Sequence, residues 1–537
     1  MDVDTKIKEI FSEWDKLDSP GCILGVIKNG EVIYTQGFGL ANLDYGIPIT
    51  PRTIFRIASV SKQFTAACIV LLAQHDLLSL DDDIRKYIPE LPEFDSVVTI
   101  RHLVHHTSGL RDYCELFFLT GSDLREFDLW NEDDIFKWVK RQKSLDFQPG
   151  HQYAYSNTGY ILLAVIIKRI TGKTLREYAD ENIFKPLGMV HTFFKDDYKM
   201  VIKNRAVGYS PKTGGGFEID DTNMVLIGDD GVFTNVDDLV LWAQNFYENK
   251  IGDERFISTL TTPGKFNSGE DSSYAFGLRL ESLGELPIIR HGGSFFGFRA
   301  GITWIPQYTM AFVCLANLST IEPLALINQV AQIYLKDEVK EKHFTTQKGN
   351  EQFIELSKKE YQDKIGKYLM QEFMVLCEIF LEDSQLKIKI GSQNFLIRPI
   401  NKNHFVSVEG PFPIRLMFNE KQITVNTTSS SYILEPIEPP KFTSSQLKEF
   451  IGDYYSEELD VVYNITEEEN SLIIKVKKEM GNLNPLFKDI FAARMNTLPY
   501  KPGIRITFSR DKQDKITGFS LSSQRASNIL FNRKDQS

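Results

Sequence analysis

Residues 55–62 read Phe-Arg-Ile-Ala-Ser-Val-Ser-Lys and lead into an apolar helix, in which Phe64 and Leu71 fall on one face. Ser59 therefore comes just before the helix, where the positive end of the helix favours an oxyanion. Lys62 lies three residues further on and returns to the same helical face, within reach of the Ser59 hydroxyl. Because a neutral lysine amine can remove the serine proton, this pair predicts a nucleophile and its base.

The S-x-x-K pattern alone is not specific, because the chain contains four matches to it. The other three begin at Ser384, Ser445 and Ser509, in sequence with the short alternating pattern of β-strands. Residues i and i+3 of a strand do not share a face, so only the Ser59 match brings the two side chains together.

A second candidate group is Tyr155-Ser156-Asn157, in a loop flanked by Gly and Pro that precedes an apolar helix predicted from Thr158 to Ile170. A phenol beside a lysine can pass a proton between nucleophile and leaving group. An asparagine can donate to a substrate carbonyl and accept from the lysine. The same two residues would also serve merely to cap the helix, and this alternative stays open here.

A third candidate is His291-Gly292-Gly293-Ser294 on a predicted strand. Paired glycines let a substrate backbone lie along the strand edge, and the Ser294 N–H would then be a second oxyanion donor beside that of Ser59. A glycine-kinked strand without a function is the alternative interpretation.

Together the three segments resemble the class C β-lactamase and D,D-peptidase-like serine hydrolases, in which S-x-x-K, Y-x-N and K/H-x-G follow in this order. Five further segments support the resemblance, which covers about residues 10–335: Phe55–Ser59, His106–Leu110, Gln148–Gly150, Pro186–Met189 and Gly231–Thr234.

The resemblance implies a role for each candidate residue. Ser59 would be the acylated nucleophile, with Lys62 and Tyr155 as the acid–base pair. Asn157 would bind the substrate amide, and the backbone N–H groups of Ser59 and Ser294 would form the oxyanion hole.

His291 departs from the lactamase and carboxypeptidase pattern, which usually has lysine at this position. Histidine, with an ordinary pKa near ~6.5, is mostly neutral at pH 7, whereas lysine is a permanent cation for a substrate carboxylate. The sequence therefore favours esters, amides or aminopeptidase-type substrates. Arg299 would supply the missing charge, unless it is a surface ion-pair partner.

A metal site is the rival to this interpretation, since His102, His105 and His106 have helix spacing. They are not part of an H-E-x-x-H arrangement, and His106 belongs to one of the matching segments, so a structural role is favoured. No Walker-type or G-x-G-x-x-G phosphate loop occurs. We therefore expect no metal and no cofactor.

Composition restricts the partners. The 537 residues carry a net charge of −11, which argues against nucleic acid or an anionic membrane. No run of about 18 apolar residues predicts a membrane span. The five cysteines form neither a disulfide framework nor a C-x-x-C motif, so free thiols are expected. The charged N-terminus, without a secretory signal, indicates a cytoplasmic protein, or an exported one whose leader was removed.

The order of expected elements predicts an α+β domain over residues 1–335, with an antiparallel sheet flanked by helices. The polar stretch 336–355 is expected to be a linker. Beyond it, Ile365–Tyr368 is echoed by Ile451–Tyr454, which predicts two small all-β, barrel-like domains over 356–440 and 441–537. Their number and order resemble those of the D-aminopeptidase branch, in which a C-terminal loop reaches the active site.

The resulting hypothesis is a metal-independent serine hydrolase that acylates Ser59 with small esters or amides, including D-amino-acid peptides. The alternative is a penicillin-binding sensor or weak β-lactamase that β-lactams acylate with slow turnover. A third possibility, a catalytically dead interaction protein, has no physical need for Ser59, Lys62, Tyr155 and Asn157 together. The sequence leaves the oligomeric state open.

Overall fold

The computed structural model describes residues 2–122, 131–335, 353–371, 375–383, 385–391, 393–410, 413–419, 422–427, 431–495 and 503–534. Its contacts divide the chain into two compact units. One comprises Met1–Tyr113 and Arg125–Glu341, and the other comprises Cys114–Leu124 and Lys342–Ser537. Each unit is considered by itself below.

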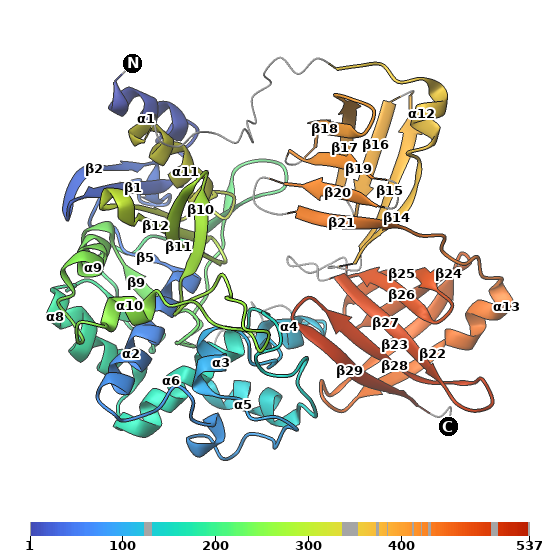
Figure 1. The fold of residues 1–537 in the computed structure, drawn as a ribbon, viewed down its shortest axis with the longest axis horizontal. Helices are drawn as coiled ribbons and strands as arrows, with labels where there is room; N and C mark the ends of the chain where they lie inside the picture. Colours follow the sequence, from blue (N-terminus) through green and yellow to red (C-terminus); the bar gives the residue numbers. More distant parts are fainter. Residues whose placement is uncertain are drawn as a thin grey trace. The chain divides into compact units, whose positions relative to one another are not determined.

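The first unit is built on a six-stranded antiparallel sheet in the order β10-β11-β12-β13-β1-β2 (Figure 1). The strands are β10 (Arg279–Leu283), β11 (Leu286–Phe295), β12 (Phe298–Ile305), β13 (Met310–Ala316), β1 (Cys22–Lys28) and β2 (Glu31–Phe38). β1 pairs with β13, so strands from the beginning and the end of this unit's sequence are neighbours in the sheet. Asn29 and Gly30 both have positive φ in the turn between β1 and β2, which suits a tight hairpin.

Helices cover this sheet. α11 (Pro323–Tyr334) packs on β12 and β13 and contacts α1 (Val3–Phe11), while α9 (Val236–Glu248) packs on β1 and β13. Seven other α-helices of this unit are α2 (Lys62–Gln74), α3 (Ile100–Val104), α5 (Glu132–Arg141), α6 (Asn157–Thr171), α7 (Leu175–Ala179), α8 (Lys185–Leu187) and α10 (Phe256–Leu260). The two apolar helices predicted from the sequence are α2 and α6. Gly172, in the left-handed conformation, ends α6 two residues beyond the predicted end at Ile170.

α2 differs from the expectation of one apolar face, because the structure buries every residue from Lys62 to Leu72. α6, α7 and α10 all contact it, so that neighbours cover several of its sides. A helix buried on all sides carries Lys62 away from solvent.

A short three-stranded sheet sets the position of the Ser59 segment. β9 (Val232–Thr234) lies between β5 (Phe55–Arg56) and β6 (Phe193–Phe194). The 3-10 helix η1 (Ala58–Ser61) follows β5 and leads directly into α2.

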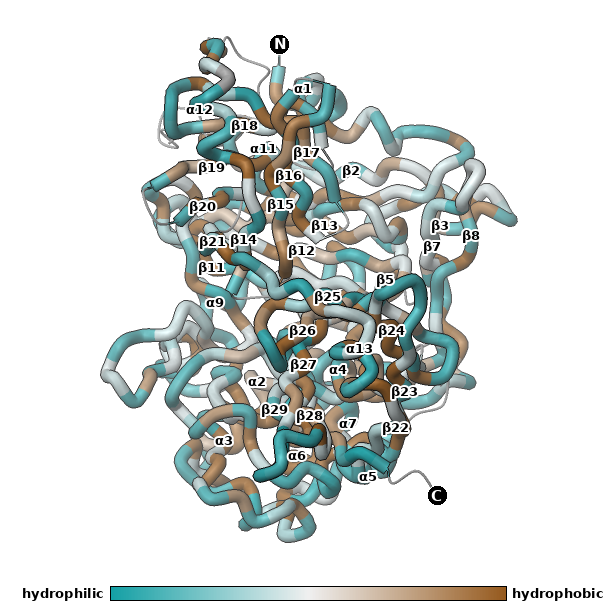
Figure 2. Tube along the Cα trace, turned by 90° about the vertical axis from the view of Figure 1, so that its right-hand side faces the viewer, coloured by the Kyte–Doolittle hydropathy of each residue, from teal (hydrophilic) through white to brown (hydrophobic). Residues whose placement is uncertain are grey.

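The second unit contains two closed, eight-stranded barrels, which confirms the predicted pair of all-β domains. The first is formed by β14 (Gly366–Met370), β15 (Val375–Glu382), β16 (Gln385–Ile390), β17 (Gln393–Pro399), β18 (His404–Glu409), β19 (Arg415–Phe418), β20 (Ile423–Asn426) and β21 (Ser431–Pro436). The second is formed by β22 (Gly452–Ser456), β23 (Val461–Glu468), β24 (Ser471–Val476), β25 (Glu479–Phe487), β26 (Ile490–Arg494), β27 (Gly503–Arg510), β28 (Ile516–Ser523) and β29 (Ala526–Arg533). Figure 2 shows the alternation of hydrophobic and hydrophilic residues along barrel strands.

A short capped helix precedes each barrel, which adds to the repeat. Ser357 with Glu360 caps α12 (Lys358–Gln362), and Thr443 with Gln446 caps α13 (Ser444–Leu447). The exact boundaries of the accessory domains stay predictions. Most of the predicted linker, residues 336–352, lies outside the described residues.

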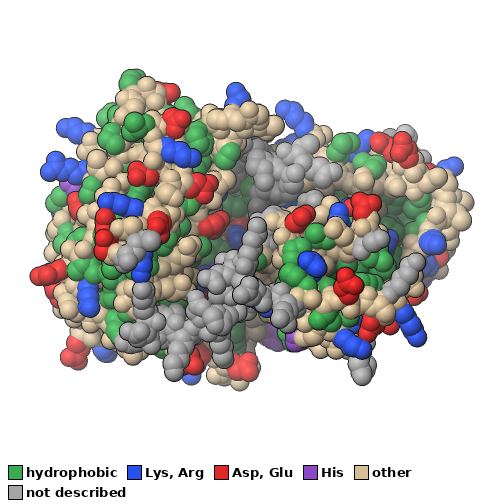
Figure 3. Space-filling view, turned by 90° about the horizontal axis from the view of Figure 1, so that it is seen from above, with side chains coloured by type: hydrophobic (Ala, Val, Ile, Leu, Met, Phe, Trp, Pro, Cys, Tyr) green, Lys and Arg blue, Asp and Glu red, His purple; other side chains and the backbone are tan. Residues whose placement is uncertain are grey.

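The surface mixes charges of both signs. In the face shown in Figure 3, Lys and Arg side chains are interspersed with Asp and Glu. Within the described residues, no helix is both long and apolar enough to span a bilayer. The five cysteines are free thiols, four of them buried and Cys114 partly exposed.

One segment leaves the first unit and belongs to the second. Chain order places residues 114–122 early in the catalytic sequence, yet they contact the second barrel. The Tyr463 hydroxyl donates to the Leu119 carbonyl at 2.6 Å, and Lys477 Nζ donates to Ser122 Oγ. Gly121 has a φ of +71°, and a Cβ there would lie 2.6 Å from the Val476 carbonyl oxygen. The β-strand pattern of the barrel sequence does not predict that residues 114–122 contact the second barrel.

Replacing Tyr463 by Phe tests this attachment. Tyr463 is fully buried, so the change leaves the Leu119 carbonyl without that donor and should cost about 1–3 kcal/mol of unfolding free energy. Urea unfolding of the full chain measures the loss. The matched control is Tyr455→Phe, since the hydroxyl of Tyr455 bonds to Asp460 in an exposed position. Equal stability of Y463F and Y455F would contradict the attachment.

Candidate active site

Ser59 lies in a constrained turn. Ala58, directly before it, has a φ of +48°, a conformation that residues with a side chain rarely adopt and that stores strain at functional sites. A Cβ on Gly293 of β11 would lie 2.2 Å from the Ile57 carbonyl oxygen, so only glycine lets the strand approach this turn. Ser59 itself is partly exposed between buried neighbours, which presents its hydroxyl to solvent.

Lys62 is fully buried, and its amine meets three acceptors. Nζ lies 3.2 Å from Ser59 Oγ, 2.8 Å from Asn157 Oδ1 and 2.7 Å from the Asp229 carbonyl oxygen. An ammonium group has three N–H donors, so these contacts use all of them. As a neutral amine, the group keeps two donors and turns a lone pair to the serine.

Asn157 is the first residue of α6 and does not cap it, because the helix has no side-chain cap. Its side chain turns instead to Lys62, and its backbone N–H donates to Asp112 Oδ2 at 2.6 Å. The capping alternative is therefore wrong for Asn157.

Tyr155 lies beside the same amine. Lys62 Nζ is 4.9 Å from the centre of the Tyr155 ring, and that ring packs at 4.2 Å from the His106 ring. The structure thus brings together Ser59, Lys62, Tyr155 and Asn157 from two segments about a hundred residues apart. Their chemical roles stay predictions.

His291 is 2% exposed, and both ring nitrogens have partners within the protein. Nδ1 lies 2.7 Å from the Gly292 carbonyl oxygen and Nε2 lies 3.0 Å from the Tyr274 hydroxyl. A ring protonated on Nδ1 satisfies both, with Tyr274 donating to Nε2. Burial, with the nearby cations of Arg279 and Lys62, lowers the pKa of His291 to about 3, so the ring is neutral at pH 7.

The rest of the third motif lines an accessible strand end. Ser294 is exposed, and Gly292 and Gly293 are partly exposed. A Cβ on Gly292 would lie 3.0 Å from Leu324 Cδ1, a tight approach. The pairing of the Ser59 and Ser294 N–H groups in one oxyanion hole stays a prediction.

Two charged residues of the site escaped the sequence analysis. Asp229, in the Gly228–Gly231 loop, is buried, and its Oδ2 accepts from the Tyr113 hydroxyl at 3.2 Å. Burial raises the pKa of Asp229 to about 7, with Asp230 and Asp112 adding to the rise and the Lys62 cation opposing it. The only signal in the sequence was two adjacent aspartates between glycines.

Arg279 is the second such residue. Arg279 is the first residue of β10 and lies opposite Arg290 of β11. Of these two arginines, only Arg290 has an ion-pair partner among the described residues, and that partner is Glu281. The guanidinium of Arg279 lies 5.7 Å from the Tyr274 ring and donates to the Tyr153 hydroxyl at 3.3 Å. It is therefore a cation beside the neutral His291.

Arg299, the predicted source of that charge, is used elsewhere. Its Nη1 donates to the carbonyl oxygens of Phe296 and Phe298 at 2.6 and 2.8 Å, and burial lowers its pKa. Arg299 therefore stabilises the turn in which it lies. In the contacts described it neither forms a surface ion pair nor contacts His291.

The three histidines with helix spacing bind different partners. His102 Nδ1 accepts from the Thr99 N–H, His105 Nδ1 lies 3.2 Å from the Tyr274 carbonyl, and His106 Nδ1 accepts from the Ser156 N–H. Within the described ranges no group of three His, Cys, Asp or Glu side chains is arranged to hold a metal ion.

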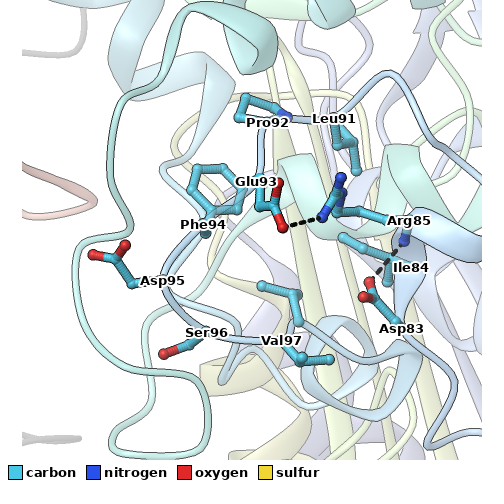
Figure 4. A pocket seen from close by; sticks show the side chains of 11 residues that line it. Asp83, Ile84, Arg85, Leu91, Pro92, Glu93, Phe94, Asp95, Ser96 and Val97 are labelled. Atoms are coloured by element: carbon cyan, nitrogen blue, oxygen red, sulfur yellow. Dashed lines mark hydrogen bonds and ion pairs between the residues drawn. The ribbon is translucent and has the colours of Figure 1, made fainter.

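A surface pocket of about 190 Å³ lies in residues 83–85 and 91–98 (Figure 4). Its Arg85–Glu93 ion pair, at 3.5 Å, joins two side chains with substantial exposure. The pocket has none of the motif residues and takes no part in the site.

Replacing Asp229 by Asn tests the buried carboxyl. The folded protein keeps a proton on Asp229 up to about pH 7, whereas the unfolded chain releases it near pH ~4. The stability from this proton is thus complete below pH ~4 and is lost as the pH rises to about 7, by at most about 1.4 kcal/mol per pH unit. Urea unfolding at pH 5 and pH 8 should show D229N gaining on the wild type at the higher pH.

The matched control for D229N is Asp237→Asn, which changes an exposed carboxyl in the first turn of α9. A difference between D229N and wild type that does not change with pH would contradict the raised pKa.

Comparison with known proteins matches residues 8–334 to the family described as Beta-lactamase. A D-aminopeptidase of Gluconobacter oxydans is 30% identical over 303 residues, which are 56% of each chain. A D-aminopeptidase of Brucella anthropi is 32% identical over 280 residues, 52% of each chain. These matches span about half the length of the curated relatives.

A solved structure supports the fold. The octameric penicillin-binding protein homologue from Pyrococcus abyssi superposes with a TM-score of 0.57 and 23% identity, covering 80% of this chain and 99% of that one. The family match extends over more than half of the sequence and includes all three motifs, which confirms the resemblance. The chain belongs to the Beta-lactamase family.

Proposed function

We propose that the protein is a metal-independent serine hydrolase that acts on small esters, amides and D-amino-acid peptides through an acyl-enzyme on Ser59. The observation that carries the proposal is the 3.2 Å contact between Lys62 Nζ and Ser59 Oγ, with Asn157 and Asp229 fixing the amine from two other sides. A nucleophile held beside an oriented base is the arrangement that covalent catalysis requires.

The proposed reaction has two stages. Lys62 takes the proton of Ser59, and Ser59 Oγ attacks the substrate carbonyl carbon, whose oxyanion is held by the N–H groups of Ser59 and Ser294. Tyr155 passes the proton to the leaving amine or alcohol, and the acyl group stays on Ser59. A water molecule then gives a proton to Tyr155 and attacks the acyl carbon. The ester bond to Ser59 breaks, Lys62 returns the proton to Ser59 Oγ, and the acid leaves.

The substrate class follows from the third motif and the relatives. Because His291 is neutral, this motif offers no permanent cation for a carboxylate on the substrate. Two curated relatives that match about half of the chain are D-aminopeptidases. Together these findings favour amides and peptides with an N-terminal D-residue.

One observation favours a second function. Arg279 places a cation beside His291, where it has no carboxylate partner among the described residues. A guanidinium in this position suits a carboxylate-bearing ligand, including a β-lactam, so that slow acylation by penicillin is the second candidate function.

Ser59→Ala tests the main proposal with D-alanine p-nitroanilide, and L-alanine p-nitroanilide serves as the control substrate. The variant should lose turnover, because no other hydroxyl is held by Lys62 in the contacts described. Tyr155→Phe should lower kcat by about 10²–10⁴-fold through loss of the acid–base group. Turnover that survives in S59A would exclude Ser59 as the nucleophile.

Arg279→Gln separates the two functions. The change should slow penicillin labelling about tenfold or more, through loss of a charge-assisted contact, and should alter turnover of the uncharged D-alanine p-nitroanilide much less. Multiple turnovers of the anilide support the hydrolase. Stoichiometric, long-lived penicillin labelling without anilide turnover would replace it with the second candidate.

A further inference from the structure

Three basic side chains gather on one face of the short β5–β9–β6 sheet. One of them, Arg56, comes three residues before Ser59, and its guanidinium lies 4.5 Å from the Phe295 ring. In the register of this sheet, Phe233 of β9 lies opposite Arg56 on one side and Phe193 on the other. Residues opposite each other in a sheet share a face, so their three side chains form one row. The Phe193 and Phe233 rings stack at 6.2 Å, in agreement with this row.

Lys195 and Arg205 extend the row on the same face. Lys195 lies two residues beyond Phe193, and Arg205 bridges to Ile54, two residues before Arg56. The charged groups of Arg56, Lys195 and Arg205 lie 5.9, 5.8 and 5.6 Å from the centre of the Phe233 ring. Three cations thus surround one aromatic ring.

Only two carboxylates form hydrogen bonds or ion pairs with these cations among the described residues. Asp230 accepts from Arg56 Nε and Nη2 at 3.0 and 2.9 Å, and Asp221 accepts from Arg205 Nη2 at 2.6 Å. Arg56 Nη1 and Arg205 Nε are buried donors without an acceptor among the described residues. Because buried N–H groups are costly when unpaired, these two donors point to a missing acceptor.

Lys195 is the third cation of this face. The residue as a whole is 2% exposed, and no hydrogen bond or ion pair of its Nζ is found in the described part of the chain, but Nζ is not one of the fully enclosed atoms that lack a partner. Burial and the nearby Arg205 and Arg56 lower the pKa of Lys195 to about 8, while Asp221 and Asp197 oppose the change. At pH 7 the lysine is still mainly an ammonium, so three cations share this face, and among the described residues only Asp230 and Asp221 bond to them directly.

We propose that this face is an anion-binding site, in which Lys195, Arg56 and Arg205 bind one compact oxyanion such as a phosphate or a carboxylate. The oxyanion supplies acceptors for Arg56 Nη1, Arg205 Nε and Lys195 Nζ at once. Access is from the side of Arg205, whose side chain is 28% exposed. The site is independent of the proposed hydrolase reaction and does not use its catalytic residues.

Thermal unfolding of the full chain at pH 6.5 and constant ionic strength tests the site, with inorganic phosphate and acetate as separate probes. A bound probe at about ten times its Kd should raise the Tm of the wild type by about 1–2 °C. A rise with phosphate alone assigns the site to phosphate-type anions, and a rise with acetate assigns it to carboxylates.

Lys195→Met should abolish most of this rise. Its matched control is Lys199→Met, which removes an exposed lysine from the same segment and should respond like the wild type. The increase in Tm on addition of the anion should also be smaller at pH 9.5, where Lys195 has lost its charge. Equal rises in K195M and wild type, or no rise with either probe, would overturn the proposal.

A second measurement needs no variant. Acetic anhydride at pH 8 should acetylate Lys195 in the wild type, and phosphate or acetate at saturating concentration should slow that modification several-fold. Lys199 in the same sample is the internal control. Peptide mass spectrometry reports both lysines, and unchanged acetylation of Lys195 with both probes would overturn the site even if K195M did not fold.

Discussion

The buried amine of Lys62 is the constraint on which the site depends. Its three acceptors come from three separate segments: the Ser59 turn, the start of α6 and the Gly228–Gly231 loop. A lysine enclosed in this way has little rotational freedom, so the position of each acceptor fixes the others. The rings of Tyr155 and Tyr160, 4.9 and 5.5 Å from Nζ, also lie beside the amine, and Lys62 is fully buried.

Backbone geometry supplies the second requirement. Ala58 is held with a positive φ, and Gly293 allows β11 to approach the Ile57 carbonyl. The strain at Ala58 persists because β5 is paired with β9 and α2 begins immediately after the turn. Ser59 thus follows a turn that is maintained by packing rather than by local conformational preference.

Charge around the site is distributed so that one group is neutral and another is a cation. Burial keeps His291 neutral, and its Nε2 bonds to the Tyr274 hydroxyl, while Arg279 lies beside both residues. In the proposed second function, the positive charge for a ligand carboxylate comes from Arg279 on the neighbouring strand β10 and not from His291. Two aromatic hydroxyls, of Tyr153 and Tyr274, lie next to that charge.

Much of this was predictable from local pattern. The apolar helix after Asn157 and the convergence of Ser59, Lys62, Tyr155 and Asn157 follow from helix spacing and motif order. The repeated Ile-Gly-x-Tyr segments predicted the two barrels.

The remaining features depend on contacts between distant segments, which leave no period in the sequence. Asp229 became relevant only because the loop after residue 227 meets Lys62 and Tyr113. Arg299 satisfies carbonyls of its own turn, and the 114–122 segment joins the second barrel through Tyr463. In each case the role of the residue depends on its contact partner rather than on its residue type.

The most direct test of the central claim is mass spectrometry of the protein quenched in acid during turnover of a slowly hydrolysed D-alanine ester. The account predicts an increase in mass equal to one acyl group, found on the peptide that contains Ser59 and absent from S59A. Turnover with no covalent adduct, or an adduct on another residue, would contradict it.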